Sequence, residues 1–230
     1  MQVINLRAPE LPYELNEELK LLRTNLQFCG VDKRVILVTS AFSGEGKSSI
    51  TFNLGRALTE LDKSVLLIDC DMRKSVLKQR VIGFRPEFGL SHYLSGQCGL
   101  DDIIYSTSIP NFSVVFSGVV PPNPTELLSN ENMSDLITIA KESFDYVILD
   151  CPPVGMVVDA AVVAPMCDGS VIVIESGEVK YRLAQEVLSK LKTTNCPILG
   201  VVLNKVNRHR SGKYYGGYYK YKYKYNGYYK

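Results

Sequence analysis

Residues 41–48, Ala-Phe-Ser-Gly-Glu-Gly-Lys-Ser, follow an apolar run and open a helical pattern. They match a phosphate-binding loop, with Ala41 in place of the first glycine of the usual pattern. Gly44 and Gly46 let backbone N–H groups turn inward around phosphates, and the helix N-terminus adds its positive dipole end. In such loops the lysine reaches the β- and γ-phosphates and the hydroxyl that follows ligates Mg²⁺. The residues predicted to bind the nucleotide are Ser43, Gly44, Glu45, Gly46, Lys47, Ser48 and Ser49.

Two further apolar runs end in carboxylates. One leads into Asp69, Asp71 and Arg73, and the other leads into Asp150. In an open parallel sheet, ligands bind beyond the carboxyl ends of the strands. Asp150 has the position of a carboxylate that holds Mg²⁺ through water. An isolated aspartate at a strand end is usually a turn or cap residue, but three of them beside a phosphate loop favour a binding site.

The end of the chain is dense in phenol hydroxyls. From Arg208 onward it has seven Lys or Arg, four Gly and no Asp or Glu. Such a segment cannot build a core, which predicts a disordered tail over residues 208–230 after a domain over residues 1–207. A flexible tail could place a phenol oxygen in line with a γ-phosphorus. The nine predicted phosphoacceptors are Tyr214, Tyr215, Tyr218, Tyr219, Tyr221, Tyr223, Tyr225, Tyr228 and Tyr229.

Charge separates the tail from the rest of the chain. Residues 1–207 carry 19 basic and 24 acidic groups, whereas the tail is basic throughout. Nine phosphates would add roughly 14–18 negative charges and repel the tail from the acidic body and from neighbouring tails. The alternative is an aromatic linker, or a tail that stacks on and neutralises single-stranded nucleic acid. We favour a tail that accepts phosphate over a linker or a nucleic-acid-binding tail, and we expect no nucleic-acid partner.

The periodicity of apolar residues predicts the elements that position these groups. Leu15, Leu19, Leu22 and Leu26 recur at helical spacing, which predicts an amphipathic helix over residues 13–28. Continuous apolar runs predict strands buried on both faces, as in a mostly parallel α/β sheet with helices on both faces. Asn123 as N-cap, with Pro124 and Glu126, predicts a further helix start. The predicted strands are 34–39, 64–69, 112–116, 146–150, 170–174 and 198–204. The other predicted helices are 48–61, 90–96, 130–143, 159–165 and 180–193.

The six cysteines show no metal-ligand spacing and predict buried free thiols. No apolar stretch reaches the ~18–20 residues of a spanning helix. The first residues also lack the pattern of a signal peptide. These features predict a cytoplasmic protein that meets a membrane only through a partner.

The Asp-x-Asp-x-Arg element at 69–73, the Asp-x-Pro-Pro element at 150–153 and the tyrosine cluster together resemble the bacterial tyrosine kinases of capsule and exopolysaccharide synthesis. Residues 121–128 also look like that family, and the resemblance covers essentially the whole chain. It implies a P-loop NTPase fold and a kinase that uses ATP and Mg²⁺. It further implies phosphorylation of the tail in trans, which would regulate polysaccharide synthesis and export.

The resemblance also implies roles for individual residues. Lys47 and Ser48 would bind ATP·Mg²⁺, with Ser48, Asp71 and Asp150 as the metal-holding groups. Asp69 would be the base for the tyrosine hydroxyl, and Arg73 would lie close to the phosphates.

Asn204 ends the last predicted strand, where related ATPases contact adenine. A strand cap is an equally good interpretation of this residue.

The family assembles into rings through a Glu-x-x-Arg-x-x-Arg motif. Here the motif is Glu17, Lys20 and Arg23, with a lysine that lacks the planar fork of arginine. A solvated charged helix face is the alternative. The resemblance implies a ring-like homo-oligomer, a transmembrane polysaccharide co-polymerase adaptor that holds the chain at the inner face of the cell membrane, and a phosphotyrosine phosphatase.

Two other classes of function were weighed. Partition-type and cell-division ATPases of this fold usually carry a second lysine early in the loop. Residues 40–43 are Ser-Ala-Phe-Ser, which counts against that class. A non-catalytic module whose tail binds nucleic acid or an anionic polymer would show strongly salt-dependent affinity and no ATP consumption.

Overall fold

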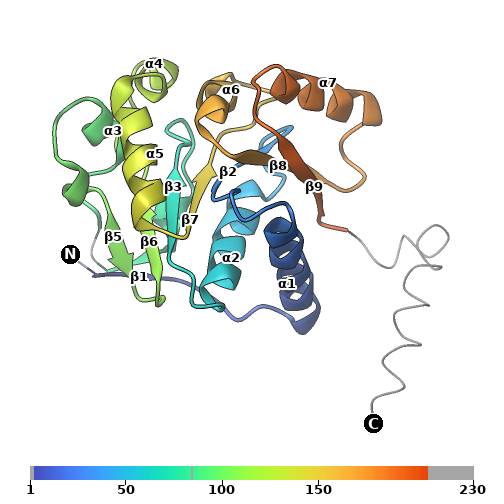
Figure 1. The fold of residues 1–230 in the computed structure, drawn as a ribbon, viewed down its shortest axis with the longest axis horizontal. Coiled ribbons are helices and arrows are strands. Elements are labelled where there is room, and N and C mark those ends of the chain that lie inside the picture. The colour runs from blue at the N-terminus through green and yellow to red at the C-terminus, as the bar shows by residue number, and fades with distance from the viewer. Residues whose placement is uncertain (1–2, 84, 207–230) are drawn as a thin grey trace, which may run out of the picture.

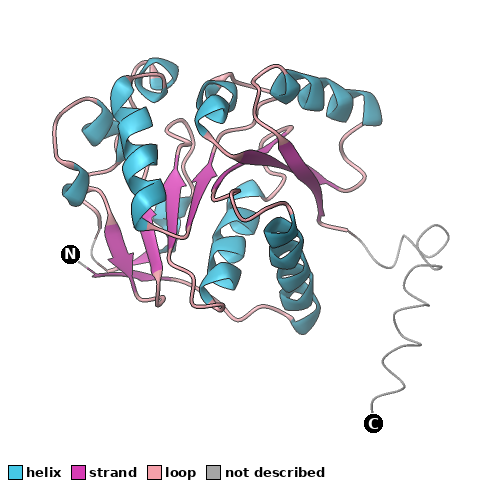
Figure 2. Cartoon of the chain, viewed as in Figure 1, coloured by secondary structure: helices cyan, strands magenta, loops and turns pink. Residues whose placement is uncertain are grey.

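The computed structural model describes residues 3–83 and 85–206. In this part of the chain the strands form one sheet in the order β4-β1-β5-β6-β3-β7-β2-β8-β9 (Figures 1 and 2). Neighbouring strands from β6 to β9 in that order are parallel. At the other edge, β5 is antiparallel to β6, β1 is parallel to β5 and β4 is antiparallel to β1. The prediction of a mostly parallel sheet is confirmed.

The strands are β1 (Val3–Leu6), β2 (Val35–Ser40), β3 (Val65–Asp69), β4 (Val81–Ile82), β5 (Tyr105–Thr107), β6 (Phe112–Val115), β7 (Tyr146–Asp150), β8 (Gly169–Glu175) and β9 (Ile198–Asn204). The α-helices are α1 (Tyr13–Phe28), α2 (Lys47–Thr59), α3 (Leu90–Leu94), α4 (Pro124–Leu128), α5 (Glu131–Ser143), α6 (Asp159–Val163) and α7 (Tyr181–Lys192). Short 3₁₀ turns are η1 (Leu77–Arg80), η2 (Leu100–Asp102) and η3 (Ala164–Met166).

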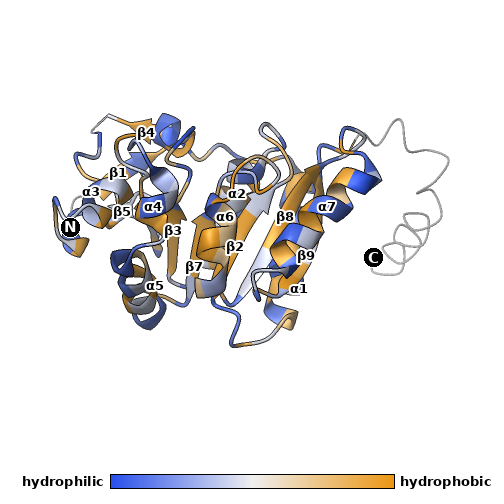
Figure 3. Ribbon diagram, turned by 90° about the horizontal axis from the view of Figure 1, so that it is seen from above, coloured by the Kyte–Doolittle hydropathy of each residue, from blue (hydrophilic) through white to orange (hydrophobic). Residues whose placement is uncertain are grey.

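Helices cover both faces of the sheet, as predicted. Helices α1 and α2 lie on one face, while α3 and α5 to α7 lie on the other (Figure 1). Every residue of β2 and β3 is buried, because each strand contributes side chains to both layers. Figure 3 shows the hydrophobic residues concentrated along these central strands. Burial of this kind holds the strands in register, so that their carboxyl ends meet at one edge of the sheet.

The predicted elements agree with the structure to within two residues at each end, and α1, β7 and β9 have the predicted bounds. Strands β1, β4 and β5 were not predicted; β4 and β5, of two and three residues, are too short to show periodicity. Helix α4 begins at Pro124 as predicted. Asn123 is the N-cap residue, as predicted, although its side chain makes no capping hydrogen bond to the backbone and its amide instead donates to Glu126 Oε2 at 3.1 Å.

All six cysteines are free thiols, as predicted, although only Cys70, Cys151 and Cys196 are fully buried. Across the two described ranges, none of the helices has both the length and the apolar character needed to span a bilayer.

At the amino-terminal edge of the sheet, the carboxylate of Asp168 fixes the start of β2. Asp168 Oδ2 accepts hydrogen bonds from the backbone N–H groups of Arg34 at 3.0 Å and Val35 at 2.8 Å. Its Oδ1 accepts from Lys141 Nζ at 2.6 Å, which ties α5 to the start of β2. Burial opposes the charged form, but the hydrogen bonds from Lys141 and the two backbone groups outweigh it and lower the pKa of Asp168.

Replacing Asp168 with alanine should lower the free energy of unfolding by about 1–3 kcal/mol, because the N–H of Val35 and the ammonium group of Lys141 lose their acceptor, while the N–H of Arg34 keeps only the Asp32 oxygen. Since the pKa of Asp168 is lower in the folded state, its stabilising contribution is present above the unfolded pKa of about 4 and is lost as pH falls. The difference between wild type and Asp168→Asn should therefore shrink below about pH 4. Denaturant unfolding at several pH values measures both effects. Asp135→Ala, an exposed carboxylate on α5, is the control and should change stability by less than about 0.5 kcal/mol. Equal losses in the two alanine variants would contradict this account.

Candidate active site

The phosphate loop joins β2 to α2 at the carboxyl-terminal edge of the sheet. Gly44 has φ = 91° and Gly46 has φ = 86°, a left-handed conformation that favours glycine. Gly46 is also fixed by space, since a Cβ there would lie 2.2 Å from Asn204 Nδ2. Ala41 is not among the described residues with positive φ, so this position of the loop tolerates a side chain. Ser43 and Ser49 are exposed and Ser48 is half-buried.

Lys47 is the buried cation of this edge. Its Nζ lies 2.7 Å from Asp150 Oδ1, 3.7 Å from Asp71 Oδ2 and 3.3 Å from the Ser48 hydroxyl. Burial opposes the charged form of Lys47, but the attraction of Asp150 and then of Asp71 outweighs it and raises the pKa. Side chains up to 103 residues apart in the sequence therefore converge at the ends of β2, β3 and β7.

Asp69 lies beside Asp150, because β3 and β7 pair in register at these two residues. Asp69 is buried and accepts hydrogen bonds from the Ser75 hydroxyl at Oδ2 and from the backbone N–H of Asp71 at Oδ1, the latter 3.1 Å long. Burial and the negative charge of Asp150 raise the pKa of Asp69 to about 7, against the lowering effect of Ser75 and Lys47. The contact of Ser75 with Asp69 was not predicted. The position of this hydroxyl in the same loop as the Asp-x-Asp-x-Arg element could have indicated it.

Arg73 is held by a carboxylate that was not predicted. Its Nε lies 2.8 Å from Asp159 Oδ2 and one terminal nitrogen lies 3.0 Å from Asp159 Oδ1. Thr125 on α4 contacts both partners, at 3.1 Å from Arg73 and 2.5 Å from Asp159. Burial opposes ionisation of Asp159, but the hydrogen bonds from Arg73 and Thr125 outweigh it and lower the pKa. The segment 121–128 thus helps to fix the guanidinium, and the proximity of Arg73 to phosphates stays a prediction.

Two predicted nucleotide contacts have protein partners. The carboxylate of Glu45 is buried and accepts backbone hydrogen bonds from Phe42 at 2.7 Å and from Glu175 at 3.1 Å. The amide of Asn204 donates to the backbone oxygen of Glu45 at 2.8 Å. Both side chains therefore support the loop, and direct contact with a nucleotide stays a prediction for each.

The predicted assembly motif lies on α1. Lys20 pairs with Glu17 within the helix at 2.8 Å. Arg23 instead reaches α2, where it donates to the Ala57 backbone oxygen and lies 3.1 Å from Glu60 Oε2. In the isolated chain Arg23 thus joins two helices, and its role between subunits stays a prediction.

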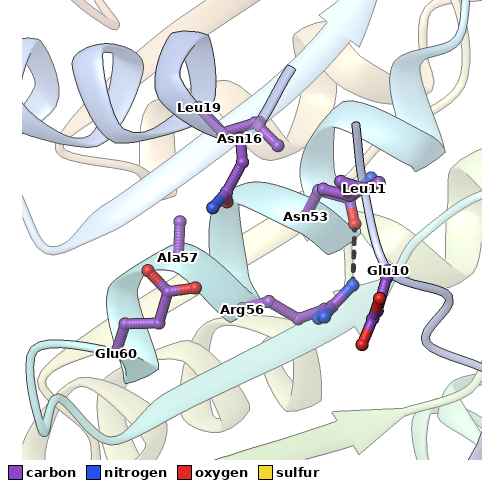
Figure 4. Close-up of a pocket in the computed structure, with 8 residues that line it drawn as sticks. All are labelled: Glu10, Leu11, Asn16, Leu19, Asn53, Arg56, Ala57 and Glu60. Atoms are coloured by element: carbon purple, nitrogen blue, oxygen red, sulfur yellow. Dashed lines mark hydrogen bonds between the residues drawn. The ribbon is translucent and has the colours of Figure 1, made fainter. Parts of the chain in front are cut away.

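A pocket of about 290 Å³ lies beside this contact, between α1, α2 and the segment that precedes α1 (Figure 4). None of its lining residues belongs to the phosphate loop or to the acidic strand ends. They are Glu10, Leu11, Asn16, Leu19, Asn53, Arg56, Ala57 and Glu60. The pocket is therefore separate from the candidate active site.

The nine tail tyrosines lie outside the described residues, as does the predicted boundary between domain and tail at 207 and 208. The geometry of the phosphoacceptors accordingly stays a prediction.

A phosphate loop at the end of the β2 strand, flanked by Asp150 on the neighbouring strand, defines a P-loop NTPase. Comparison with known proteins agrees, since residues 33–198 match the AAA domain family. The cell division ATPase MinD of Pyrococcus furiosus has a similar structure, with a TM-score of 0.65 and 27% identity over 76% of this chain and 73% of that chain.

Several bacterial tyrosine kinases are more similar to this chain than that cell division ATPase is. The chain is 41% identical over 191 residues to the tyrosine-protein kinase CpsD of Streptococcus agalactiae, covering 83% of each. It is 35% identical over 217 residues to the tyrosine-protein kinase YwqD of Bacillus subtilis (strain 168), covering 92% of this chain and 91% of that one. The kinase domain of the Escherichia coli tyrosine kinase ETK has a TM-score of 0.78 and 32% identity over 84% of this chain and 76% of that chain. The chain belongs to the bacterial tyrosine-protein kinase family.

The site geometry predicts an unusual titration. The Asp69 carboxyl should titrate near pH 7 in the nucleotide-free protein, since burial and Asp150 disfavour its charge. Asp150→Asn should lower this pKa because it removes a negative charge. Ser75→Ala should raise it because it removes a hydrogen bond to the carboxylate. Carboxyl ¹³C NMR measures all three values, and titration of Asp69 below about pH 5 in the wild type would contradict the geometry.

Proposed function

We propose that this chain is an ATP-dependent protein-tyrosine kinase that phosphorylates its own C-terminal tyrosine cluster in trans. The observation that carries this proposal is the meeting of Lys47, Asp71 and Asp150 beside the buried Asp69. The family to which the chain belongs supports the same reaction, the transfer of a phosphoryl group from ATP to a protein tyrosine. Regulation of capsular or exopolysaccharide synthesis and export is the physiological role that we propose.

The residues at this edge fit an ATP·Mg²⁺ complex. The Ser48 hydroxyl and the carboxylates of Asp71 and Asp150 offer oxygen atoms, which are the ligands Mg²⁺ prefers. Mg²⁺ usually keeps waters and binds phosphate oxygens beside one or two carboxylates, and when bound it would neutralise charge on the transferring phosphoryl group. Lys47 would exchange its contact with Asp150 for contact with the phosphates. Ser43, Gly44, Gly46 and Ser49 complete the loop that we propose binds the nucleotide.

Asp69 is the group that we propose accepts the proton of the tyrosine hydroxyl. A general base works best when its pKa lies near the operating pH, and the pKa of Asp69 is raised to about 7. Ser75 and the backbone N–H of Asp71 hold the carboxylate in one orientation. Arg73, fixed by Asp159, would lie close to the phosphates and stabilise charge during transfer.

We further propose the partners that this reaction needs. Transfer in trans requires a homo-oligomer, and Glu17, Lys20 and Arg23 on α1 would supply contacts in a ring-like assembly. A transmembrane polysaccharide co-polymerase adaptor would hold the cytoplasmic kinase at the inner face of the cell membrane. A phosphotyrosine phosphatase would remove the phosphates from the tail. Phosphates on the tail would drive subunits apart by like-charge repulsion.

Mixing two defective chains tests transfer in trans. Lys47→Met removes the cation of the loop and should show no phosphotyrosine alone, when made in cells without other tyrosine kinases. An active chain that lacks residues 208–230 should phosphorylate the intact tail of the Lys47→Met chain. Mass spectrometry maps the modified tyrosines, and light scattering before and after ATP reports assembly.

Lys190→Met, which changes an exposed lysine on α7, is the matched control and should phosphorylate its own tail at the wild-type level. Thermal unfolding checks that the Lys47→Met chain is folded. Phosphotyrosine on Lys47→Met alone would overturn the catalytic assignment. An unmodified tail in the mixture, with no change in mass on ATP addition, would overturn transfer in trans.

A further inference from the structure

Gly44 and Glu45 of the phosphate loop are hydrogen-bonded to residues at the ends of β8 and β9. These two strands do not carry Asp69, Asp71 or Asp150. Glu45 Oε1 accepts a hydrogen bond from the backbone N–H of Glu175, at the end of β8, and its Oε2 accepts from Phe42 within the loop. Glu45 is only 3% exposed, so these backbone donors, rather than bulk water, supply the hydrogen bonds of its carboxyl group. The Glu45 carboxylate therefore holds the loop in place through hydrogen bonds on its buried side.

Residues at the end of β9 donate two further hydrogen bonds, both to backbone oxygens of the phosphate loop. Asn204 Nδ2 donates to the Glu45 oxygen at 2.8 Å, and Lys205 Nζ donates to the Gly44 oxygen at 2.8 Å. Lys205 also lies 2.7 Å from Glu175 Oε2, which connects it to the end of β8. Lys205 has φ = 56°, an uncommon conformation for a residue other than glycine. Glu45, Asn204 and Lys205 together form what we call the loop latch.

The geometry of the peptide bond gives the latch a consequence for binding. In a planar trans peptide, the C=O of one residue and the N–H of the next point in opposite directions. When Lys205 and Asn204 hold the oxygens of Gly44 and Glu45 on their side of the loop, the N–H groups of Glu45 and Gly46 are turned to the opposite side. Convergent N–H groups of this kind are the donors that bind phosphates.

We propose that Glu45, Asn204 and Lys205 are positioning residues that fix these two peptide planes, so that the N–H groups of Glu45 and Gly46 face the nucleotide phosphates. This inference rests on the proposed function, in which the loop binds ATP. It assigns Asn204 to the loop rather than to adenine. Lys205 and the carboxylate of Glu45 act on the nucleotide only through the backbone.

Two ligands distinguish the latch from an adenine contact. Titrations of the full-length chain with a fluorescent ATP analogue and with inorganic tripolyphosphate, each with Mg²⁺, report binding with and without a base. If Asn204 acts through the loop, Asn204→Ala should weaken both ligands by the same factor, roughly tenfold for the loss of one latch bond. A loss confined to the ATP analogue would overturn the assignment and make Asn204 an adenine contact.

Lys205 gives the second arm of the experiment. Lys205→Met should weaken both ligands roughly tenfold, because methionine keeps the apolar stem but cannot donate to Gly44. Lys205→Arg should restore most of the affinity. Lys192→Met, an exposed lysine of α7, is the matched control and should bind as the wild type does.

Thermal unfolding without ligand separates positioning from general stability. The latch predicts that Lys205→Met unfolds within about 2 °C of the wild type, since Lys205 is exposed and surface pairs contribute little to stability. Wild-type affinity in both Lys205→Met and Asn204→Ala would overturn the latch. A wild-type chain that binds neither ligand would overturn the proposed function, and the latch with it.

Discussion

The ion pair between Lys47 and Asp150 is the interaction on which the rest of the site depends. An ammonium group that is almost fully buried needs a carboxylate partner, and here it has Asp150 at 2.7 Å and Asp71 at 3.7 Å. Burial of Asp69, together with the excess negative charge of three carboxylates beside one cation, raises the pKa of Asp69. In the function that we propose, the same excess would favour binding of Mg²⁺ with a nucleotide. Lys47 contacts the two carboxylates in this structure and would exchange them for the phosphates of the nucleotide.

The fold makes this convergence possible because β2, β7 and β3 are adjacent, parallel and buried on both faces. Their carboxyl ends carry the phosphate loop, Asp150 and Asp69 respectively, and the last two residues pair in register. A slip of one residue would turn the side chain of Asp69 or Asp150 to the other face of the sheet. At the opposite edge Asp168 fixes the start of β2. The side chains of the candidate active site are therefore positioned by strands that have little freedom to shift.

The sequence predicted the parts that local patterns encode. Apolar runs located the central strands, the glycine spacing located the phosphate loop, and Asp69, Asp71 and Asp150 were expected at strand ends. The partners of Arg73 and Glu45 were not predictable, because Asp159 and the backbone of Glu175 lie 86 and 130 residues away and meet these groups only after folding. The contacts of Arg23 with α2 were likewise not predicted, and its role between subunits stays a prediction. Strands β4 and β5, of two and three residues, are too short for periodicity to show.

The pH dependence of autophosphorylation, compared between wild type and Asp69→Asn, tests the central claim that burial and the neighbouring charges make Asp69 a general base. The wild-type rate should rise with pH up to about 7 and then level off, since only the deprotonated carboxylate can accept the phenol proton. Asp69→Asn should still bind ATP·Mg²⁺, transfer phosphate about 10²–10⁴-fold more slowly and lose this dependence. An Asp69→Asn chain that transfers phosphate at the wild-type rate, or that keeps the rise near pH 7, would contradict the account.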